Sequence, residues 1–582
     1  MRLSDETRIG RVRQVLGATV TVELSPELVG TAPLWRGRVV PVGQVGSIVR
    51  IPQGSITLLG SVVLVGISDL SPPLAPEQAV EQGKRWLQLR MLGEVDAFGK
   101  FQRGVSMYPG LDDDVHFSTA DDLALIYPPV ESDRVTVGVL AAAPEVPLTL
   151  DPSRLVTRHC AVVGSTGSGK TSAVATLIQR FEVDWPSANI VVVDPHGEYA
   201  SAVSDSDCVR SVGSGSTARL RVPYWALPAS RLLSVLCDVD SRTISDRFGE
   251  LVVEERRAFA AEAAWLNVDP QSITADTPVP YDLRSVWYQL DHDNRATFSD
   301  SKKTTPARSN EGDRANLVGA TFEPHSLGSA APFKGPTFGL YNPATDRLRL
   351  RLTDPRFDFF LEIPDPAEDD PLPAIAAEWL GNHRPVSVLD FSGVPFDVAD
   401  VAIGLVLDLL FELAARSSGG GIGRSHPVLL VLEEAHRYLR GGLAQVAADR
   451  IAREGRKHGV GMMMVSQRPS ELPETSLAQC GTILALRLTN SADQSAVRNA
   501  LPDTVSGLAD VLPSLRTGEA LVSGEAVVLP TRALIDRPSP EPQASDPSLE
   551  PWRIKPATDV DVAGAVAGWR QGTALTERTS HD

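Results

Sequence analysis

A glycine-rich segment from Gly164 to Thr171 has the pattern G-x-x-x-x-G-K-T and limits which folds are open to this chain. It follows an apolar run at 160–163 and precedes a helical pattern at 172–178, so a buried strand, a loop and a helix are expected in that order. In such a loop, glycines let backbone N–H groups turn toward phosphate oxygens, lysine neutralises the phosphates, and the threonine hydroxyl binds Mg²⁺. The segment therefore predicts a site for ATP or GTP, with these nucleotide-binding residues: Gly164, Ser165, Thr166, Gly167, Ser168, Gly169, Lys170, Thr171 and Ser172.

Length and composition predict a multidomain globular protein. The chain has 582 residues, 42% of them apolar, which is enough for about three or four domains of ordinary size. Its 73 acidic and 55 basic residues give a formal charge of −18, so any nucleic acid must be held by a local basic surface. The four cysteines lie far apart and are expected to be reduced, buried thiols. The chain start lacks an apolar signal core, and apolar runs such as 61–67 are too short to span a bilayer, which predicts a cytoplasmic protein without a membrane segment.

The amino-terminal part differs in pattern from the rest. Residues 7 to about 75 alternate apolar and polar positions between glycines, for example at 18–22, 37–42 and 46–51. Short strands at close spacing predict a small β-barrel, assigned to residues 1–75. We interpret this domain as an oligomerisation or docking platform rather than a catalytic unit. Residues 76–154 are interpreted as a mixed connecting segment.

From about residue 155, strands and helices alternate, which predicts an α/β domain over 155–535 with a mainly parallel sheet. The expected buried strands are at 160–163, 190–194, 385–390, 428–432 and 461–465, with a helix at 398–415. A helical insertion over about 225–345 interrupts this pattern; it has helices at 229–239 and 248–266, followed by a polar surface loop at 291–336. Residues 536–582 are expected to form a linker and a helix near 560–570.

Two adjacent carboxylates, Glu433 and Glu434, follow the apolar strand at 428–432. A strand presents successive side chains to opposite sides, so the two residues cannot share a role. We assign Glu433 to the Mg²⁺ shell and Glu434 to activating the attacking water. The alternative is an acidic helix N-terminus that suits the helix dipole. Asp194 ends a second strand, where it either helps to hold the metal or forms part of a strand-to-turn transition; the sequence leaves both interpretations open.

An arginine near an ATP site can raise the rate of phosphoryl transfer by roughly 10³–10⁵. Arg456 lies in a basic segment at the end of a predicted helix, where cations also favour the helix dipole. We favour a catalytic role for Arg456 over this capping role, because the next strand ends at Gln467. Gln467 is expected at the same sheet edge as the nucleotide, where its amide can orient water or sense the γ-phosphate.

The ordered set of motifs resembles the HerA family of hexameric DNA-translocating ATPases, within the FtsK/HerA superfamily. The motifs are Arg158-His159, Asp194-Pro195-His196-Gly197-Glu198-Tyr199, Glu433-Glu434-Ala435-His436, Glu454-Gly455-Arg456-Lys457, Ser466-Gln467-Arg468-Pro469 and Thr517-Gly518-Glu519-Ala520. The resemblance covers about 155–530 well and the barrel more weakly. One departure is Glu433, where many relatives carry Asp. The segment at 291–336 has no counterpart that we can match.

The resemblance implies a RecA-like P-loop ATPase core, a homo-hexamer with ATP and Mg²⁺ bound between neighbouring subunits, and double-stranded DNA in the central channel. Arg158 and Arg456 would stabilise charge on the phosphates, one of them across the subunit interface, and Gln467 would be the polar sensor. The barrels would dock a partner, and the carboxy-terminal tail would resemble a brace over a neighbouring subunit.

Two functions remain open at this stage. The first is an ATP-driven motor that moves duplex DNA and works with a nuclease of the NurA type, in DNA end processing or antiviral defence. The second is a scaffold ring whose nucleotide state assembles and switches an effector, either a nuclease or a sirtuin-type NAD hydrolase. A protein-unfolding ring matches the motifs less well. The absence of an Asn-Lys-x-Asp motif disfavours GTP.

Overall fold

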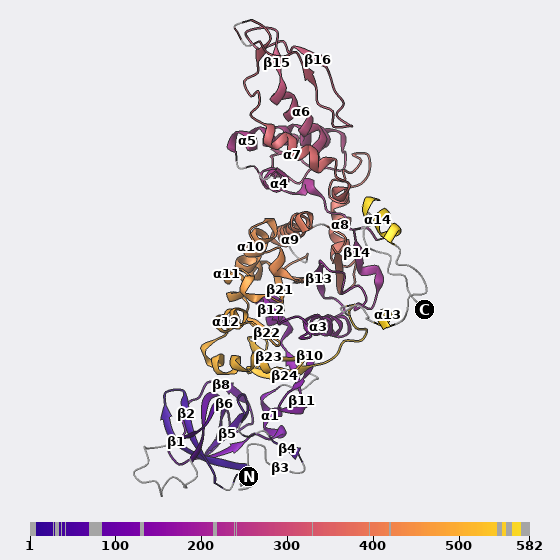
Figure 1. The fold of residues 1–582 in the computed structure, drawn as a ribbon. Helices are drawn as coiled ribbons and strands as arrows, with labels where there is room; N and C mark the ends of the chain where they lie inside the picture. The colour runs from indigo at the N-terminus through magenta and orange to yellow at the C-terminus, as the bar shows by residue number, and fades with distance from the viewer. Residues whose placement is uncertain are drawn as a thin grey trace.

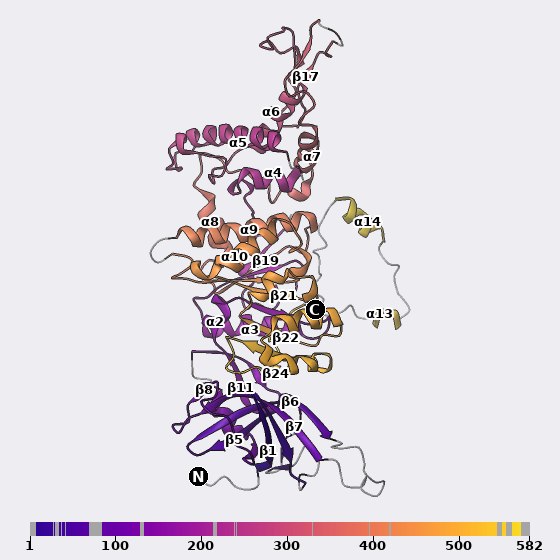
Figure 2. The same cartoon turned by 90° about the vertical axis from the view of Figure 1, so that its left-hand side faces the viewer.

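The computed structural model describes residues 7–68 without 27, 29–33, 36–37, 41 and 43; 84–127; 133–543 without 213–217, 238, 240, 327, 329, 395 and 418–420; and 550–553 and 562–571. Three bodies follow one another along the molecule: the amino-terminal barrel, a central sheet with helices on both faces, and a helical insertion at the far end (Figures 1 and 2). No helix in the described part of the chain is both long and apolar enough to cross a membrane.

The amino-terminal domain is a closed barrel, because β2 pairs with β1 on one side and with β7 on the other. Alternate residues of each strand point inward, so Val12, Val20, Val22 and Val49 are fully buried. The barrel strands are β1 Arg8–Leu16, β2 Thr19–Leu24, β5 Ile48–Gln53, β6 Ile56–Ser68, β7 Lys84–Val95 and β9 Asp114–Phe117, with β8 Phe101–Arg103 extending the sheet beyond β7 and a separate ribbon of β3 Leu34–Trp35 and β4 Arg38–Val39.

The barrel strands continue to Phe117, so the predicted end at residue 75 is wrong. Residue 75 itself lies within 69–83, a range outside the described residues. The barrel needs β7 to close against β2, and β9 lies between β1 and β5. These pairings join strands far apart in the sequence, which local alternation cannot reveal. Part of the predicted strand at 37–42 also lies outside the described residues, at 37 and 41.

The central sheet confirms the predicted α/β class and all five predicted strands. Seven neighbouring strands are parallel and an antiparallel group flanks them on one side. The parallel strands, in spatial order, are β22 Thr482–Ala485, β12 Cys160–Val163, β21 Val460–Ser466, β20 Val428–Leu432, β13 Asn189–Asp194, β19 Val386–Asp390 and β14 Val209–Ser211. The antiparallel strands are β23 Glu519–Gly524, β24 Thr531–Ile535, β10 Val135–Leu140 and β11 Ala143–Leu150.

Strands β10 and β11 belong to this sheet, although the sequence placed them in a connecting segment that ends at 154. The central domain therefore begins at about residue 135. Strand β10 pairs with β24 near the end of the domain, a partner about 390 residues away that its own sequence does not indicate. The four cysteines are buried and none forms a disulfide, as expected.

Helices cover both faces of the sheet because its strands are apolar on both sides. One set of strand side chains, with Ala161 and Val163, packs with α9 Phe396–Arg416 and α10 Leu443–His458. The alternate set, with Cys160 and Val162, packs with α3 Lys170–Asp184. The other helices of this domain are α2 Pro152–Thr157, α11 Glu474–Ala478 and α12 Ser491–Ala500. Helix α1 Ala120–Ile126 lies between the barrel and this domain in the sequence.

The insertion leaves the sheet after β14 and returns at β19, so it is longer than the predicted 225–345. It contains α4 Ala229–Cys237, α5 Arg242–Glu262, α6 Leu283–Arg295, α7 Asn342–Leu352 and α8 Pro371–Trp379. The predicted loop at 291–336 instead carries two small antiparallel sheets, β15 Thr297–Phe298 with β18 Phe333–Lys334 and β16 Arg308–Asn310 with β17 Thr321–Phe322. Strands this short in a polar sequence have no apolar alternation to detect. Near the chain end lie α13 Glu550–Arg553 and α14 Val562–Gln571, the latter close to the predicted 560–570.

Candidate nucleotide site

The loop between β12 and α3 has the shape that a triphosphate requires. Gly167 and Gly169 adopt positive φ angles of 71° and 99°, which favour glycine. A Cβ atom on Gly164 would lie 2.5 Å from the Ser168 hydroxyl oxygen, so this position also needs glycine. The loop is anchored on both sides of β12, because Gly164 N donates to Ser466 O at 3.2 Å and Ser165 N donates to Arg487 O at 2.8 Å.

Two polar side chains where the loop meets α3, Lys170 and Ser168, are arranged for an anion. Lys170 is only 7% exposed. Burial lowers the pKa of Lys170, although the negative charges of Glu434, Glu433 and Glu198 act to raise it. The Ser168 hydroxyl is buried and has no hydrogen-bond partner among the described residues. A buried ammonium beside an unsatisfied hydroxyl is costly without a ligand, so the loop fits a phosphate group.

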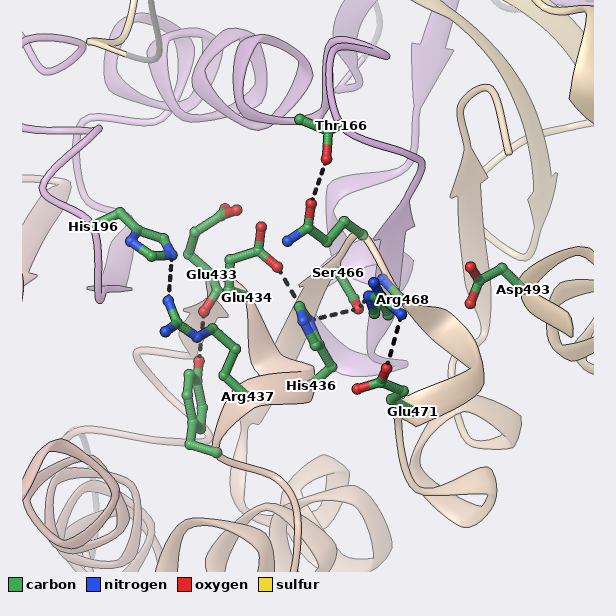
Figure 3. Close-up of polar contacts among 12 residues, drawn as sticks. Thr166, His196, Glu433, Glu434, His436, Arg437, Ser466, Arg468, Glu471 and Asp493 are labelled. Atoms are coloured by element: carbon green, nitrogen blue, oxygen red, sulfur yellow. Dashed lines mark hydrogen bonds and ion pairs between the residues drawn. The ribbon is translucent and has the colours of Figure 1, made fainter. Parts of the chain in front are cut away.

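The acidic pair lies opposite this loop, where β20 ends, and the two carboxylates have different surroundings (Figure 3). Glu433 is 1% exposed, and its Oε2 accepts a hydrogen bond from the Tyr199 hydroxyl at 2.5 Å. Burial raises the pKa of Glu433 to about 8, so it keeps a proton near neutral pH unless a cation is close. A buried carboxyl group that needs a positive partner fits a role near Mg²⁺.

Glu434 is the ionised member of the pair. Burial pushes its pKa upward, but the contact with His436 and the charge of Lys170 outweigh burial, and the pKa of Glu434 is lowered. His436 Nδ1 lies 3.1 Å from Glu434 Oε2. The backbone of Glu434 is left-handed, with φ 47° and ψ 41°, which is uncommon for any residue other than glycine. A carboxylate in this state can accept a proton from water.

Asp194 uses both of its oxygens to hold the turn that follows β13. Its Oδ1 accepts hydrogen bonds from the backbone N–H groups of His196 and Gly197, and its Oδ2 accepts one from Tyr199 N, all at 2.9–3.0 Å. Burial raises the pKa of Asp194 to about 7. Of the two interpretations that the sequence left open, this geometry favours the strand-to-turn role over metal binding.

The same turn brings Glu198 to the phosphate loop, where Thr171 Oγ1 donates to Glu198 Oε2 at 3.0 Å. Thr171, Glu433 and Glu198 carry oxygen atoms of the kind that Mg²⁺ prefers. In the described part of the chain, no group of three or more His, Cys, Asp or Glu side chains is placed to hold a metal ion by itself.

Gln467 lies at the phosphate loop, as the sequence predicted for a residue that follows β21. Thr166 Oγ1 donates a hydrogen bond to Gln467 Oε1 at 2.7 Å (Figure 3). Arg487, which the sequence did not single out, follows β22 at the same edge and lies beside Gly167, with its Nη2 3.5 Å from the Gly167 carbonyl oxygen. No motif marks Arg487, because β22 is a four-residue strand without a strong pattern.

The two candidate arginines lie at the opposite edge of the sheet. Arg158 lies two residues before the start of β12, and Arg456 is in the last turn of α10, just before β21. Strands β12 and β21 are parallel neighbours, so both arginines are at amino ends, whereas the phosphate loop and Gln467 follow the carboxyl ends. A four-residue strand spans about 13 Å. The structure therefore does not bring Arg158 or Arg456 to the phosphate loop of the same chain.

Arg158 and Arg456 also differ in their contacts. The Arg158 Nε atom lies 3.6 Å from Glu525 Oε2, a weak surface pair. Arg456 is exposed at the end of α10. Both side chains are thus accessible to a second molecule.

A mainly parallel sheet, a phosphate loop between β12 and α3, and an acidic pair at the end of β20 define a P-loop ATPase with a RecA-like core. Comparison with protein families assigns the particular group. Residues 135–410 match the model of the helicase HerA central domain, and residues 407–531 match the helicase HerA-like C-terminal model. The chain belongs to the HerA family.

Relatives with known names agree with this assignment. The chain is 26% identical over 459 residues to the DNA double-strand break repair helicase HerA of Pyrococcus furiosus, covering 76% of each chain. It is 35% identical over 189 residues to the protein of the same name from Sulfolobus acidocaldarius, covering 32% of this chain and 38% of the relative.

Among solved structures, similarity is more distant. VirB4 of Thermoanaerobacter pseudethanolicus matches with a TM-score of 0.44 and 14% identity, covering 71% of this chain and 97% of VirB4. Plasmid coupling protein TrwB, solved with the non-hydrolysable ATP analogue ADPNP, matches with a TM-score of 0.44 and 15% identity, covering 72% of this chain and 93% of TrwB.

Proposed function

We propose that this chain is the subunit of a homo-hexameric ring that hydrolyses ATP to move duplex DNA. The observation that carries the proposal is the division of the site between two edges of one sheet. Lys170, Glu434 and Gln467 gather at one edge, and the arginines that would stabilise the phosphate charge lie at the other. A ring in which each subunit places its arginine edge against the next phosphate loop completes every site.

Each residue at the phosphate-loop edge has a definite proposed task. Lys170 would neutralise the phosphates, and Thr171 and Glu433, with Glu198 nearby, would hold Mg²⁺. When bound, Mg²⁺ neutralises charge on the phosphate oxygens. Glu434 would take the proton of the attacking water, because its carboxylate is ionised at neutral pH. Gln467, which contacts Thr166 of the loop, would orient that water or register the γ-phosphate.

Duplex DNA is supported as the substrate by the family and by a local basic surface. The Pyrococcus relative is named a DNA double-strand break repair helicase. A cleft of about 660 Å³ lies between the insertion and the loop after the acidic pair, with a single acidic lining residue, Asp400, in the described part of the chain. Its basic lining residues are Arg231, Arg351, Arg437 and Arg440. Contacts of this kind hold the phosphate backbone without reading sequence, as a translocase requires.

The motor would act in the cytoplasm with a nuclease of the NurA type or another effector, in DNA end processing or antiviral defence. The barrel is the surface that we propose for this partner, since it lies at the end of the molecule away from the insertion (Figure 2). The catalytic residues described above serve ATP hydrolysis, so a nuclease or NAD hydrolase activity would come from the partner.

The proposal is tested by the ATPase rate of the purified ring with and without linear duplex DNA. We expect the DNA to raise the rate and added salt to weaken the effect, because phosphate contacts release counterions. If the ATPase rate does not change with DNA but rises when the partner alone is added, the motor proposal is wrong and the nucleotide-switched scaffold is favoured.

A further inference from the structure

His436 lies directly behind the acidic pair and contacts two separate parts of the site. It is 5% exposed, and its Nδ1 lies 3.1 Å from Glu434 Oε2 and 3.2 Å from Ser466 Oγ (Figure 3). The hydrogen bond of Nδ1 is with Ser466 Oγ, whereas Glu434 Oε2 lies close to Nδ1 but has no hydrogen-bond partner among the described residues. A carboxylate accepts and does not donate, so we assign the ring proton to Nδ1 from these two neighbours. The N–H group assigned to Nδ1 therefore bonds to the end of a neighbouring strand and lies 3.1 Å from an oxygen of the Glu434 carboxylate.

Ser466 connects this N–H group to the phosphate loop. It is the last residue of β21 and is fully buried. Its Oγ accepts a hydrogen bond from Arg468 N at 3.0 Å, and its carbonyl accepts one from Gly164 N at 3.2 Å. The turn closed by the Ser466–Arg468 bond carries Gln467, whose side chain contacts Thr166. A continuous path therefore runs from the loop through Gln467 and Ser466 to His436.

The backbone of Glu434 is in a sparsely populated conformation, which the surrounding contacts must hold. Two backbone contacts hold the chain on either side of it: Arg437 N donates to Glu434 O at 2.8 Å, and the Tyr438 hydroxyl donates to Glu433 O at 3.0 Å. Neither of these contacts involves the carboxylate itself. The contact of His436 Nδ1 is with a carboxylate oxygen, Glu434 Oε2, as the dashed line in Figure 3 marks.

We propose that His436 is a positioning residue that fixes the Glu434 carboxylate and couples it, through Ser466, to the turn that carries Gln467. The proposal rests on the proposed role of Glu434 in activating water. A change in what Gln467 contacts would shift the 466–468 turn, alter the contact of Ser466 with Nδ1, and so move Glu434. Sensing at Gln467 and water activation at Glu434 would then be mechanically linked.

The first test compares His436→Asn with His436→Leu, two side chains of similar size. The Asn amide nitrogen takes a place near Nδ1 and can still donate, whereas Leu cannot. We expect H436L to lower kcat about 10- to 100-fold, the usual cost of losing such a support, with KM and ATP binding within about threefold of wild type. H436N should recover at least part of that loss.

His116→Leu is the matched control, because His116 is also buried but lies in the barrel. H116L should leave kcat unchanged. Equal loss of turnover in H436N and H436L, or loss of ATP binding and thermal stability in proportion to kcat, would overturn the proposal in favour of a packing role.

The second test removes Glu434 first. In a Glu434→Gln background, adding H436L should cause no further loss of kcat, because His436 acts through that carboxylate. A further tenfold loss would overturn the proposal. Wild-type hydrolysis by E434Q alone would instead reject the proposed role of Glu434, so the two failures are distinguishable.

Ser466→Ala gives a route that does not depend on the folding of H436L. It should lower kcat without changing ATP binding, and its effect should be smaller in the H436L background than in wild type. An unchanged kcat in S466A, or full additivity with H436L, would break the proposed path from Gln467 to Glu434.

Discussion

Two neighbouring glutamates at the end of β20 show how surroundings divide chemical roles. Glu433 points into a fully buried site beside the Tyr199 hydroxyl, and burial raises its pKa to about 8. Glu434 faces His436 and Lys170, and its pKa is lowered although burial opposes this. The sequence separated the two roles from strand geometry alone. The different surroundings of Glu433 and Glu434 come from Tyr199 and His436, and only the folded chain places these two residues beside the glutamates.

Asp400 of α9 gives a pH dependence that can be measured. Burial raises the pKa of Asp400 to about 6, although hydrogen bonds from the backbone N–H groups of Ala444 and Leu443 act to lower it. An unfolded aspartate has a pKa of about 3.9, so between these values the folded chain binds more protons and its free energy of unfolding falls as pH rises. We expect the thermal unfolding midpoint of Asp400→Asn, compared with that of wild type, to be more favourable at pH 7.5 than at pH 4.5.

The matched control is Asp369→Asn, which removes one negative charge at an exposed position. If the unfolding midpoints of D400N and wild type differ by the same amount at both pH values, the carboxyl group of Asp400 is not destabilised by burial. The result would not depend on nucleotide, because the measurement uses the free protein.

At the scale of elements, the tail after β24 runs along α3 and reaches the turn that carries Glu198. Ser539 N donates to Gln179 Oε1 at 2.8 Å, Gln179 Nε2 donates to Pro540 O at 2.7 Å, and Gln543 N donates to Glu198 O at 3.0 Å. The tail therefore supports the turn that delivers a carboxylate to Thr171.

Removing residues 539–582 should weaken Mg²⁺-ATP binding about threefold to tenfold, as expected for losing the hydrogen bond from Gln543 N to Glu198 O, at about 0.5–1.5 kcal/mol. Removing only 544–582 is the control, since it spares all three contacts but also deletes the terminal helices. The comparison is made by nucleotide titration. Equal affinities of the two truncated chains would show that residues 539–543 do not support the site.

Elements were predictable where the pattern is local. Five of the seven parallel strands are continuous apolar runs, and α9 at 396–416 has a clear helical period, so the sequence predicts these elements. The sequence does not reveal the places of β7, β9 and β10 in their sheets, because each pairs with a strand far away in the chain.

The candidate site divides in the same way. The phosphate loop, the acidic pair and Gln467 follow apolar strands, and the end of a buried parallel strand is a position that the sequence reveals. Arg487 follows a strand too short to recognise, and the preference of Asp194 for the turn depends on three backbone amides that only the folded turn presents. The opposite placement of Arg158 and Arg456 follows from the sheet order, which motifs alone do not give.

At the scale of the whole molecule, the central domain lies between the β-barrel at one end and the helical insertion at the other (Figures 1 and 2). The barrel is joined to it by Arg103, which donates to the carbonyls of Val527 and Val528 at 2.7 Å. The insertion is joined to it by Arg231, whose Nη1 lies 2.7 Å from Asp408 Oδ2 of α9. These contacts join the barrel and the insertion to the central sheet, which carries the ATPase site.

The central claim is that each ATP site is completed by the neighbouring subunit, and co-expression of two inactive variants tests it most directly. One variant carries Lys170→Ala, which disables the phosphate loop, and the other carries both Arg158→Ala and Arg456→Ala. In mixed rings at equal amounts, about a quarter of the interfaces pair an intact loop with an intact arginine edge. We expect the mixture to regain about a quarter of the wild-type ATPase rate; a rate no higher than that of the two parents would contradict the account.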